Sequence, residues 1–150
     1  MDILFCLNEI ILNLKKYNCN LNDTSFIVET AEALDALEGN LGIDNAQACL
    51  LAVILELSGW QKVNLPAIAT WLKITYTEAL SLVPDIRALE EKGLIAMDEN
   101  FGVVVPAEAI EAFIGNHSPH GNQQVEYNDF DEQEATYSRI LDTVLTGESS

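Results

Sequence analysis

Basic side chains are scarce in this sequence of 150 residues: seven Lys and Arg stand against 24 Asp and Glu, for a net charge of −17. Proteins that bind nucleic acid use Lys and Arg to displace the counterions around the phosphates, and anionic membranes attract the same two residues. The composition therefore disfavours nucleic acid and membrane surfaces as partners. It favours a protein partner that is neutral or basic.

Sequence motifs that mark nucleotide-binding or hydrolytic sites are also absent. The chain contains no G-x-x-x-x-G-K-[ST], no G-x-G-x-x-G and no G-x-S-x-G. Adjacent carboxylates such as Glu90-Glu91 are common in a chain this acidic, and they are expected on the surface rather than in a catalytic pair. We predict no catalytic residue, no cofactor and no enzymatic activity for this chain.

The sequence contains three cysteines, an odd number. Cys6 and Cys49 lie in apolar runs and Cys19 in a polar stretch near Lys15 and Lys16. No two of them have the spacing of metal ligands, so free and mostly buried thiols in a reducing cytoplasm are expected. Cys19 is the weaker, alternative candidate for a reactive thiol, because nearby lysines favour the thiolate.

Histidine and long apolar runs are equally limited. His117 and His120 flank Ser118-Pro119 without a neighbouring Cys or His, so we expect solvated linker histidines and no metal site. The longest apolar run, Ala48 to Leu55, is far below the ~20 residues that span a bilayer. The apolar N-terminal stretch contains acidic residues, so neither a secretory signal nor a membrane span is predicted.

The clearest pattern that is present lies in residues 75–95. Thr75 and Glu78 have the spacing of a capping box, and apolar residues then recur at helical spacing as far as Leu89. Gly93 follows the charged end of this helix, as a left-handed cap residue does. Pro84 is incompatible with a straight helix. It either kinks the helix or begins a second one.

The flanking segments predict a mainly α fold. The residues that we expect to face inward from the second helix are Phe26, Ile27, Ala31, Leu34 and Leu37, and those from the last helix are Ala109, Ile110, Phe113 and Ile114. A hairpin turn over 98–102 is expected to use positive φ at Asn100 or Gly102. The predicted elements are helices over 2–17, 24–38, 44–58, 65–73, 75–92 and 106–114, and strands over 94–97 and 103–105.

Helix 2–17 is amphipathic, and two interpretations of its apolar stripe are open. The first is packing within its own domain, which we expect. The second is a homodimer through this helix, although the pattern covers only about two heptads, fewer than a coiled coil needs. Helix 44–58 is apolar all round and is therefore predicted to be the central helix of the core.

Three parts are expected along the chain. Residues 1–43 form a helical extension packed on the core, residues 44–115 the main domain, and residues 116–150 a linker with an acidic segment. In that last segment a short helix over about 131–145 is plausible, and it either docks on the domain or leads into further chain.

The segments LPAIATWL (65–72), EALSLVPDIRALEEKGLI (78–95) and VVVP (103–106) resemble the winged helix-turn-helix superfamily that includes MarR-type regulators. The resemblance implies a winged helix with two additional N-terminal helices and a small hairpin as the wing. More narrowly, the pattern with its proline resembles the winged-helix segment that precedes the ATPase module of some bacterial AAA-type ATPases. That would imply a regulatory domain at the N-terminus of a larger cytoplasmic protein.

Two functions follow from this outline. A DNA-binding regulator of MarR-like type would need Arg, Lys, Asn or Gln on the exposed face of helix 75–92 and on the wing, but acidic residues stand there. We therefore expect a non-catalytic domain that binds a protein partner, with DNA binding as the alternative. The predicted interaction surface is Tyr76, Glu78, Asp85, Asp98, Glu99 and Phe101.

Overall fold

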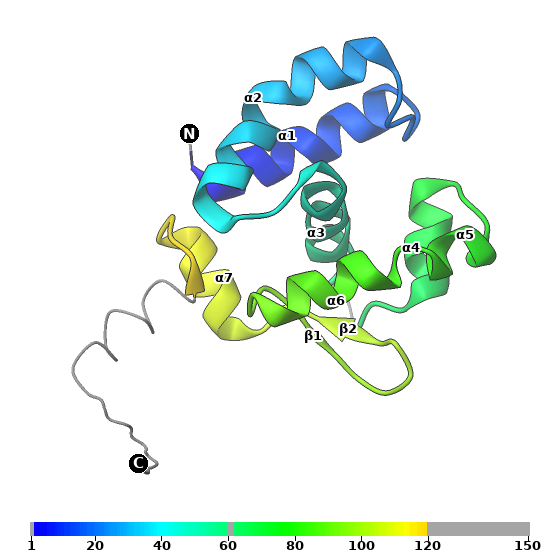
Figure 1. Ribbon diagram of the computed structural model, residues 1–150, viewed down its shortest axis with the longest axis vertical. Coiled ribbons are helices and arrows are strands. Elements are labelled where there is room, and N and C mark those ends of the chain that lie inside the picture. The colour runs from blue at the N-terminus through cyan, green and yellow to red at the C-terminus, as the bar shows by residue number, and fades with distance from the viewer. Residues whose placement is uncertain (1, 60–61, 120–150) are drawn as a thin grey trace. The chain divides into compact units, whose positions relative to one another are not determined.

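The computed structural model describes residues 2–59 and 62–119 (Figure 1). Residues up to Ser118 belong to one compact unit, which is mainly helical with a small antiparallel hairpin. The predicted helix over 131–145 and His120 lie outside the described residues. The elements are α1 (Ile3–Lys16), α2 (Thr24–Leu41), α3 (Asn45–Leu57), α4 (Leu65–Leu72), α5 (Tyr76–Leu80), α6 (Val83–Glu91), β1 (Ala96–Met97), β2 (Val103–Val104) and α7 (Ala107–Ile114).

Helix α3 is the centre of the unit, as predicted. Every residue from Ala48 to Ile54 is buried, and Figure 1 shows the other helices arranged around this one. Asp44 and Gln47 form a capping box at its start: the Gln47 N–H donates to Asp44 at 2.9 Å and the Asp44 N–H to Gln47 at 3.2 Å. A helix that is apolar on all sides must be covered by others, and here α1, α2, α4 and α6 cover it.

Helix α1 packs within its own unit, against α2, α3 and α7, which confirms the first interpretation of its amphipathic pattern. Its junction with α2 contains one buried polar pair, in which Asn13 Nδ2 donates to Thr30 Oγ1 at 3.1 Å. Thr30 occupies a position on the inward face of α2, so that face is displaced from the predicted one. Ile27 and Ala31, predicted to face inward, are exposed.

Helix α2 is also longer than the sequence pattern predicted. Gly39 continues the helix, which ends instead at Gly42 with φ of +71°. A left-handed residue at that position favours glycine because no Cβ meets the backbone. The extra turn buries Leu41, which lengthens the contact with the rest of the core.

The stretch 75–92 forms two helices rather than one kinked helix. The capping box is present: the Glu78 N–H donates to Thr75 Oγ1 at 3.1 Å, and the Thr75 N–H to Glu78 Oε1 at 2.9 Å. Helix α5 ends at Leu80, and α6 begins at Val83 with Pro84 in its first turn. A first-turn position needs no N–H donor within the helix, so the proline starts α6 without loss of a hydrogen bond.

The hairpin is shorter than predicted and is joined by a third segment. Strands β1 and β2 pair antiparallel with Ala96 opposite Val104 and Met97 opposite Val103. On the other edge of β2, Val63 and Val103 exchange backbone hydrogen bonds of 2.9 and 2.6 Å. Leu94 and Ile95, expected in the first strand, are buried just before it, and Val105 lies beyond the second.

The last described helix, α7, packs on the beginning of α1. The Ile3 N–H donates to Asn116 Oδ1 at 2.9 Å, which connects the two ends of the unit. Ala109 and Phe113 are buried as predicted, together with Ala112. Ile110 and Ile114 were wrongly predicted to face inward and are exposed, because α7 contacts the unit along a narrow stripe of small residues and one phenylalanine.

Candidate interaction surface

The six residues of the predicted interaction surface lie in three places. Tyr76 and Glu78 are on α5, Asp85 is in the first turn of α6, and the other three, Asp98, Glu99 and Phe101, are in the hairpin turn. Figure 1 shows α5 and the hairpin turn as two separate projections of the unit. A partner that contacted all six would have to span both projections.

On α5 the two predicted residues differ in what they can offer. Tyr76 is half-exposed and stands at the first position of the helix. Glu78 is exposed, but one carboxylate oxygen already accepts the Thr75 N–H at 2.9 Å. Glu78 is therefore part of the local structure as well as of the surface, and Tyr76 is the better candidate for direct contact with a partner.

Asp85 lies apart from both projections. Its side chain is half-buried and accepts a long hydrogen bond, 3.5 Å, from Gln47 Nε2 of α3. A carboxylate in the first turn of a helix also interacts favourably with the helix dipole. These contacts give Asp85 a structural role in joining α6 to α3.

The hairpin turn is organised by the carboxylate of Asp98. Its Oδ1 accepts the N–H groups of Asn100 at 2.9 Å and Gly102 at 2.7 Å, and its Oδ2 accepts a hydrogen bond of 2.7 Å from Lys62. The Lys62 hydrogen bond and then that of the Gly102 N–H lower the pKa of Asp98 below its ordinary value. This carboxylate is an anchor for the turn rather than an uncommitted acceptor.

Phe101 carries the positive φ that was predicted for Asn100 or Gly102. Its φ is +62°, and its half-buried side chain packs against the hydrophobic core. The guanidinium of Arg87 lies 5.9 Å from the ring centroid, within cation–π range. Phe101 is therefore half-buried rather than exposed, whereas Asp98, Glu99 and Asn100 of the same turn are exposed.

Sequence reasoning missed the basic partners of this turn. Lys62 lies 36 positions from Asp98, and Arg87 lies on α6. No local pattern relates them to the hairpin, and the acidic residues alone suggested an uncompensated negative wing.

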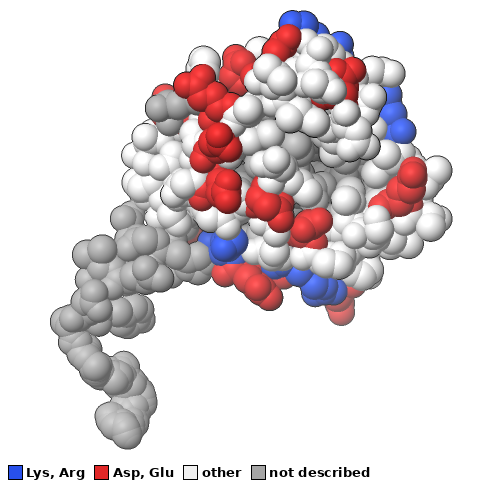
Figure 2. Space-filling view, turned by 45° about the horizontal axis from the view of Figure 1, so that its top comes forward, with Lys and Arg blue, Asp and Glu red and all other residues white. Residues whose placement is uncertain are grey.

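The negative charge of the chain is visible on its surface. Figure 2 shows acidic side chains distributed across one face, with the basic ones mainly near its margins.

The cysteines have the environments of unreactive thiols. Burial raises the pKa of Cys6 and raises that of Cys49 to about 12. Burial also raises the pKa of Cys19, against an opposing effect of Lys73, and the Cys19 thiol donates to the Trp71 carbonyl at 3.4 Å. A catalytic cysteine needs a lowered pKa, so the alternative role for Cys19 is not supported.

Within 2–59 and 62–119, no group of three or more His, Cys, Asp or Glu side chains could hold a metal ion. His117 contacts its neighbour, with Nδ1 placed 3.3 Å from the Ser118 carbonyl oxygen. None of the described helices is by itself long and apolar enough to cross a membrane; α2 and α3 reach that length only together, and they meet at 91°.

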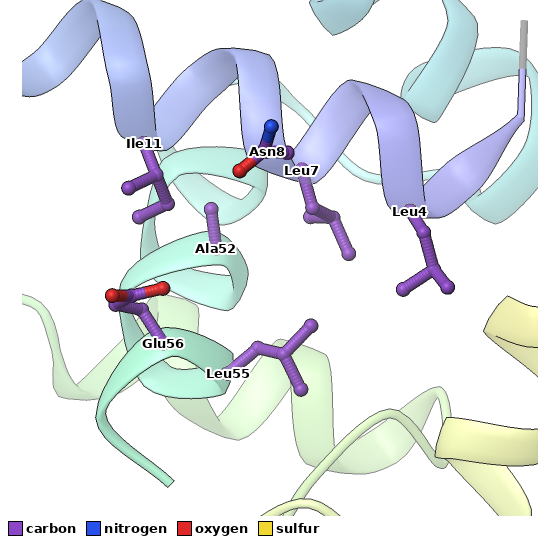
Figure 3. A pocket seen from close by; sticks show the side chains of 7 residues that line it. All are labelled: Leu4, Leu7, Asn8, Ile11, Ala52, Leu55 and Glu56. Carbon is purple, nitrogen blue, oxygen red and sulfur yellow. The ribbon is translucent and has the colours of Figure 1, made fainter. Parts of the chain in front are cut away.

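Among the described residues, two of the surface cavities have volumes of about 220 Å³ each; the walls of the first are polar almost as much as apolar, whereas those of the second are mainly apolar. The first lies between α1 and α3 (Figure 3) and is lined by Leu4, Leu7, Asn8, Ile11, Ala52, Leu55 and Glu56. The second lies between α2 and α3 and is lined by Leu21, Phe26, Ile27, Leu34, Asn45, Ala46 and Cys49.

Comparison with known proteins assigns the chain to no group. No protein-family model matches the sequence, and no curated protein matches it.

Proposed function

We propose that this chain is a non-catalytic protein-interaction domain of winged-helix type that contacts its partner through Tyr76 and Glu99. The order of elements supports the winged-helix assignment: α3, the Val63 segment, α4, α5 with α6, the hairpin and α7 follow one another. In this proposal β1 and β2 are the wing, and α1 and α2 are additions in front of it.

The observation that supports the interaction function over DNA binding is that the basic side chains around the hairpin are paired with groups of the same chain. Lys62 is paired with Asp98 and Arg87 lies over Phe101. A DNA-binding wing presents such cations to phosphate, and these two are directed to the protein's own groups. The break between α5 and α6 also replaces the straight helix that a major groove admits.

DNA binding, the alternative function, has a direct test. Fluorescence anisotropy with a mixed-sequence duplex, titrated at several salt concentrations, should show no binding that depends steeply on salt. Affinity that falls steeply as salt rises, and that disappears in the Lys73→Ala/Lys92→Ala variant, would replace the interaction function with DNA binding.

The protein-interaction function is tested by a photo-crosslinking amino acid placed at Tyr76 in the full chain, in cells of the native host. We expect a discrete adduct with one protein, weakened by Glu99→Lys, which reverses an exposed charge. The control position is Val28 on α2, which is also exposed. No adduct from position 76, or the same adducts from position 28, would contradict the proposal.

The narrower resemblance adds one expectation to this function. If the domain precedes an AAA-type ATPase module, the native gene should continue past the codon for Ser150 into a G-x-x-x-x-G-K-[ST] segment. Sequencing that region tests the expectation. A stop codon there would leave the interaction domain without the ATPase.

A further inference from the structure

The outer face of α1 is apolar although it does not contribute to the core. Leu4, Phe5 and Leu12 are 40%, 50% and 49% exposed. The opposite side of α1 is buried against α2, α3 and α7. Phe5 and Leu12 are seven residues apart, which places them two turns apart on one face, with Asn8 between them. The solvent side of a surface helix is normally polar, so this face has the character of an interface.

A hollow lies beside this face. The cavity of about 220 Å³ between α1 and α3 begins at Leu4 and Asn8. Figure 3 shows Leu4, Leu7 and Ile11 projecting from α1 above it, and Leu55 of α3 below it. A side chain from another helix laid along α1 would therefore meet a recess lined by leucines and by the polar Asn8 and Glu56, as a knob meets a hole in paired helices.

Charge at the two ends of α1 indicates what that other helix is. Asp2 stands at the start and Lys15 and Lys16 at the end. Lys16 pairs with Glu29 of α2 at 3.1 Å, and Lys15 is exposed. Two copies of α1 side by side in parallel would place lysines against lysines, whereas an antiparallel pair places Asp2 against Lys15 and aligns the helix dipoles favourably.

We propose that the outer face of α1 is the interface between two copies of this chain, paired antiparallel about a two-fold axis that passes between Asn8 and Glu9. The face is complementary to itself in this orientation, because its apolar residues meet apolar residues and the acidic end of each helix meets the basic end of the other. Phe5 of one copy packs against Leu12 of the second, and Asp2 faces Lys15. This surface is separate from Tyr76 and Glu99, so the two proposals stand independently.

Asn8 defines the register of the pair. The amides of Asn8 from the two copies lie beside the axis, offset along the helices by about 1.5 Å, and each can both donate and accept a hydrogen bond. A single asparagine in an otherwise apolar helix interface is known to select one register and orientation. Phe5 of the two copies, in contrast, lie about 10 Å apart along the helices, since seven residues separate Phe5 from Leu12 at about 1.5 Å each.

The interface is small, because it covers about two heptads of one helix, so association should be weak and dependent on concentration. Sedimentation equilibrium of the full chain should show the apparent mass rising toward that of a dimer between about 1 and 500 µM. Leu12→Glu should weaken dimerisation at least tenfold. Val28→Glu, at an apolar position of α2 that is more exposed, is the matched control and should dimerise normally.

Circular dichroism verifies that both variants fold, which is expected since both side chains are exposed. A wild-type chain that stays monomeric throughout this range would overturn the proposal. Equal dimerisation of the Leu12→Glu variant and the wild type would overturn it as well.

Disulfide trapping tests the antiparallel geometry separately. In a Cys19→Ser background the native cysteines that remain are buried. Under mild oxidation, Asn8→Cys should give a covalent dimer on its own. Phe5→Cys and Leu12→Cys should each give little dimer alone but an abundant mixed dimer when combined. Efficient self-crosslinking of Phe5→Cys would indicate a parallel pair and would overturn the proposed orientation.

Discussion

The junction of α1 with α2 and the region from α4 to β2 are held together by different interactions. The first is an apolar contact with one buried polar pair, Asn13 and Thr30, and its one ion pair among the described residues, Lys16 with Glu29, is exposed and contributes little. The second relies on side chains that bind backbone groups: Asn64 accepts the Ala67 N–H at 2.8 Å and Glu90 accepts the Met97 N–H at 3.2 Å. Stability should therefore depend on packed volume in the first region and on caps and charges in the second.

The largest expected effect is from a leucine truncation made once in each region. Leu14 is fully buried in α1, whereas Leu80 on α5 is 41% exposed. Leu14→Ala should lower the free energy of unfolding by about 2–5 kcal/mol, because it removes apolar contacts and leaves a cavity. Leu80→Ala should cost about 1 kcal/mol or less. Urea unfolding monitored by circular dichroism measures both, and equal losses would show that the comparison is wrong.

The buried polar pair should give the next largest effect. Thr30→Val removes the acceptor of the Asn13 amide, which is itself almost completely buried. An unsatisfied buried donor costs about 1–3 kcal/mol. Replacement of both partners, Asn13→Leu with Thr30→Val, should restore part of that stability. A full double-mutant cycle in urea gives the coupling energy, and additive single effects would mean that the hydrogen bond contributes nothing.

Local patterns predicted most of the fold. Capping boxes at Asp44 and Thr75 use residues three positions apart, so they could be recognised directly. The apolar run of α3 has no polar side, which identified the central helix. Pro84 was recognised as incompatible with a straight helix, but the choice between a kink and two helices depends on how α6 packs against α3.

Features that depend on distant partners could not be predicted. Thr30 faces inward because Asn13 lies opposite it, and a polar residue cannot be recognised as buried from spacing alone. Phe101 takes a positive φ in a turn arranged by the Asp98 carboxylate. The environment of two candidate surface residues also depends on distant partners: Phe101 is half-buried and Asp98 is paired because Lys62 and Arg87 approach from other elements.

Caps should produce a smaller and more local effect. Thr75→Ala removes the acceptor of the Glu78 N–H, and loss of such a cap costs about 1 kcal/mol. The amide of Glu78 should then exchange faster with solvent, with little change at amides of α1. Thr77→Ala, two residues further on and exposed, is the control. Equal acceleration in α1 would show that the two regions do not respond separately.

The smallest expected effect concerns the charge that arranges the hairpin turn. The Lys62 hydrogen bond lowers the pKa of Asp98 below its ordinary value of 3.8, so the folded turn favours the ionised carboxylate. The contribution of the ionised carboxylate to stability is fully present above pH 3.8 and is lost as the pH falls through the lower pKa of the folded state.

The Gly102 amide, which donates to Asp98, should report this titration in NMR spectra with a midpoint below 3.8. Lys62→Met should move the midpoint up toward the ordinary value, and Lys73→Met, which removes a lysine that does not contact Asp98, should leave it in place. A wild-type midpoint at or above 3.8 would mean that the charge pair does not stabilise the turn, and that charge contributes less to this region than the comparison requires.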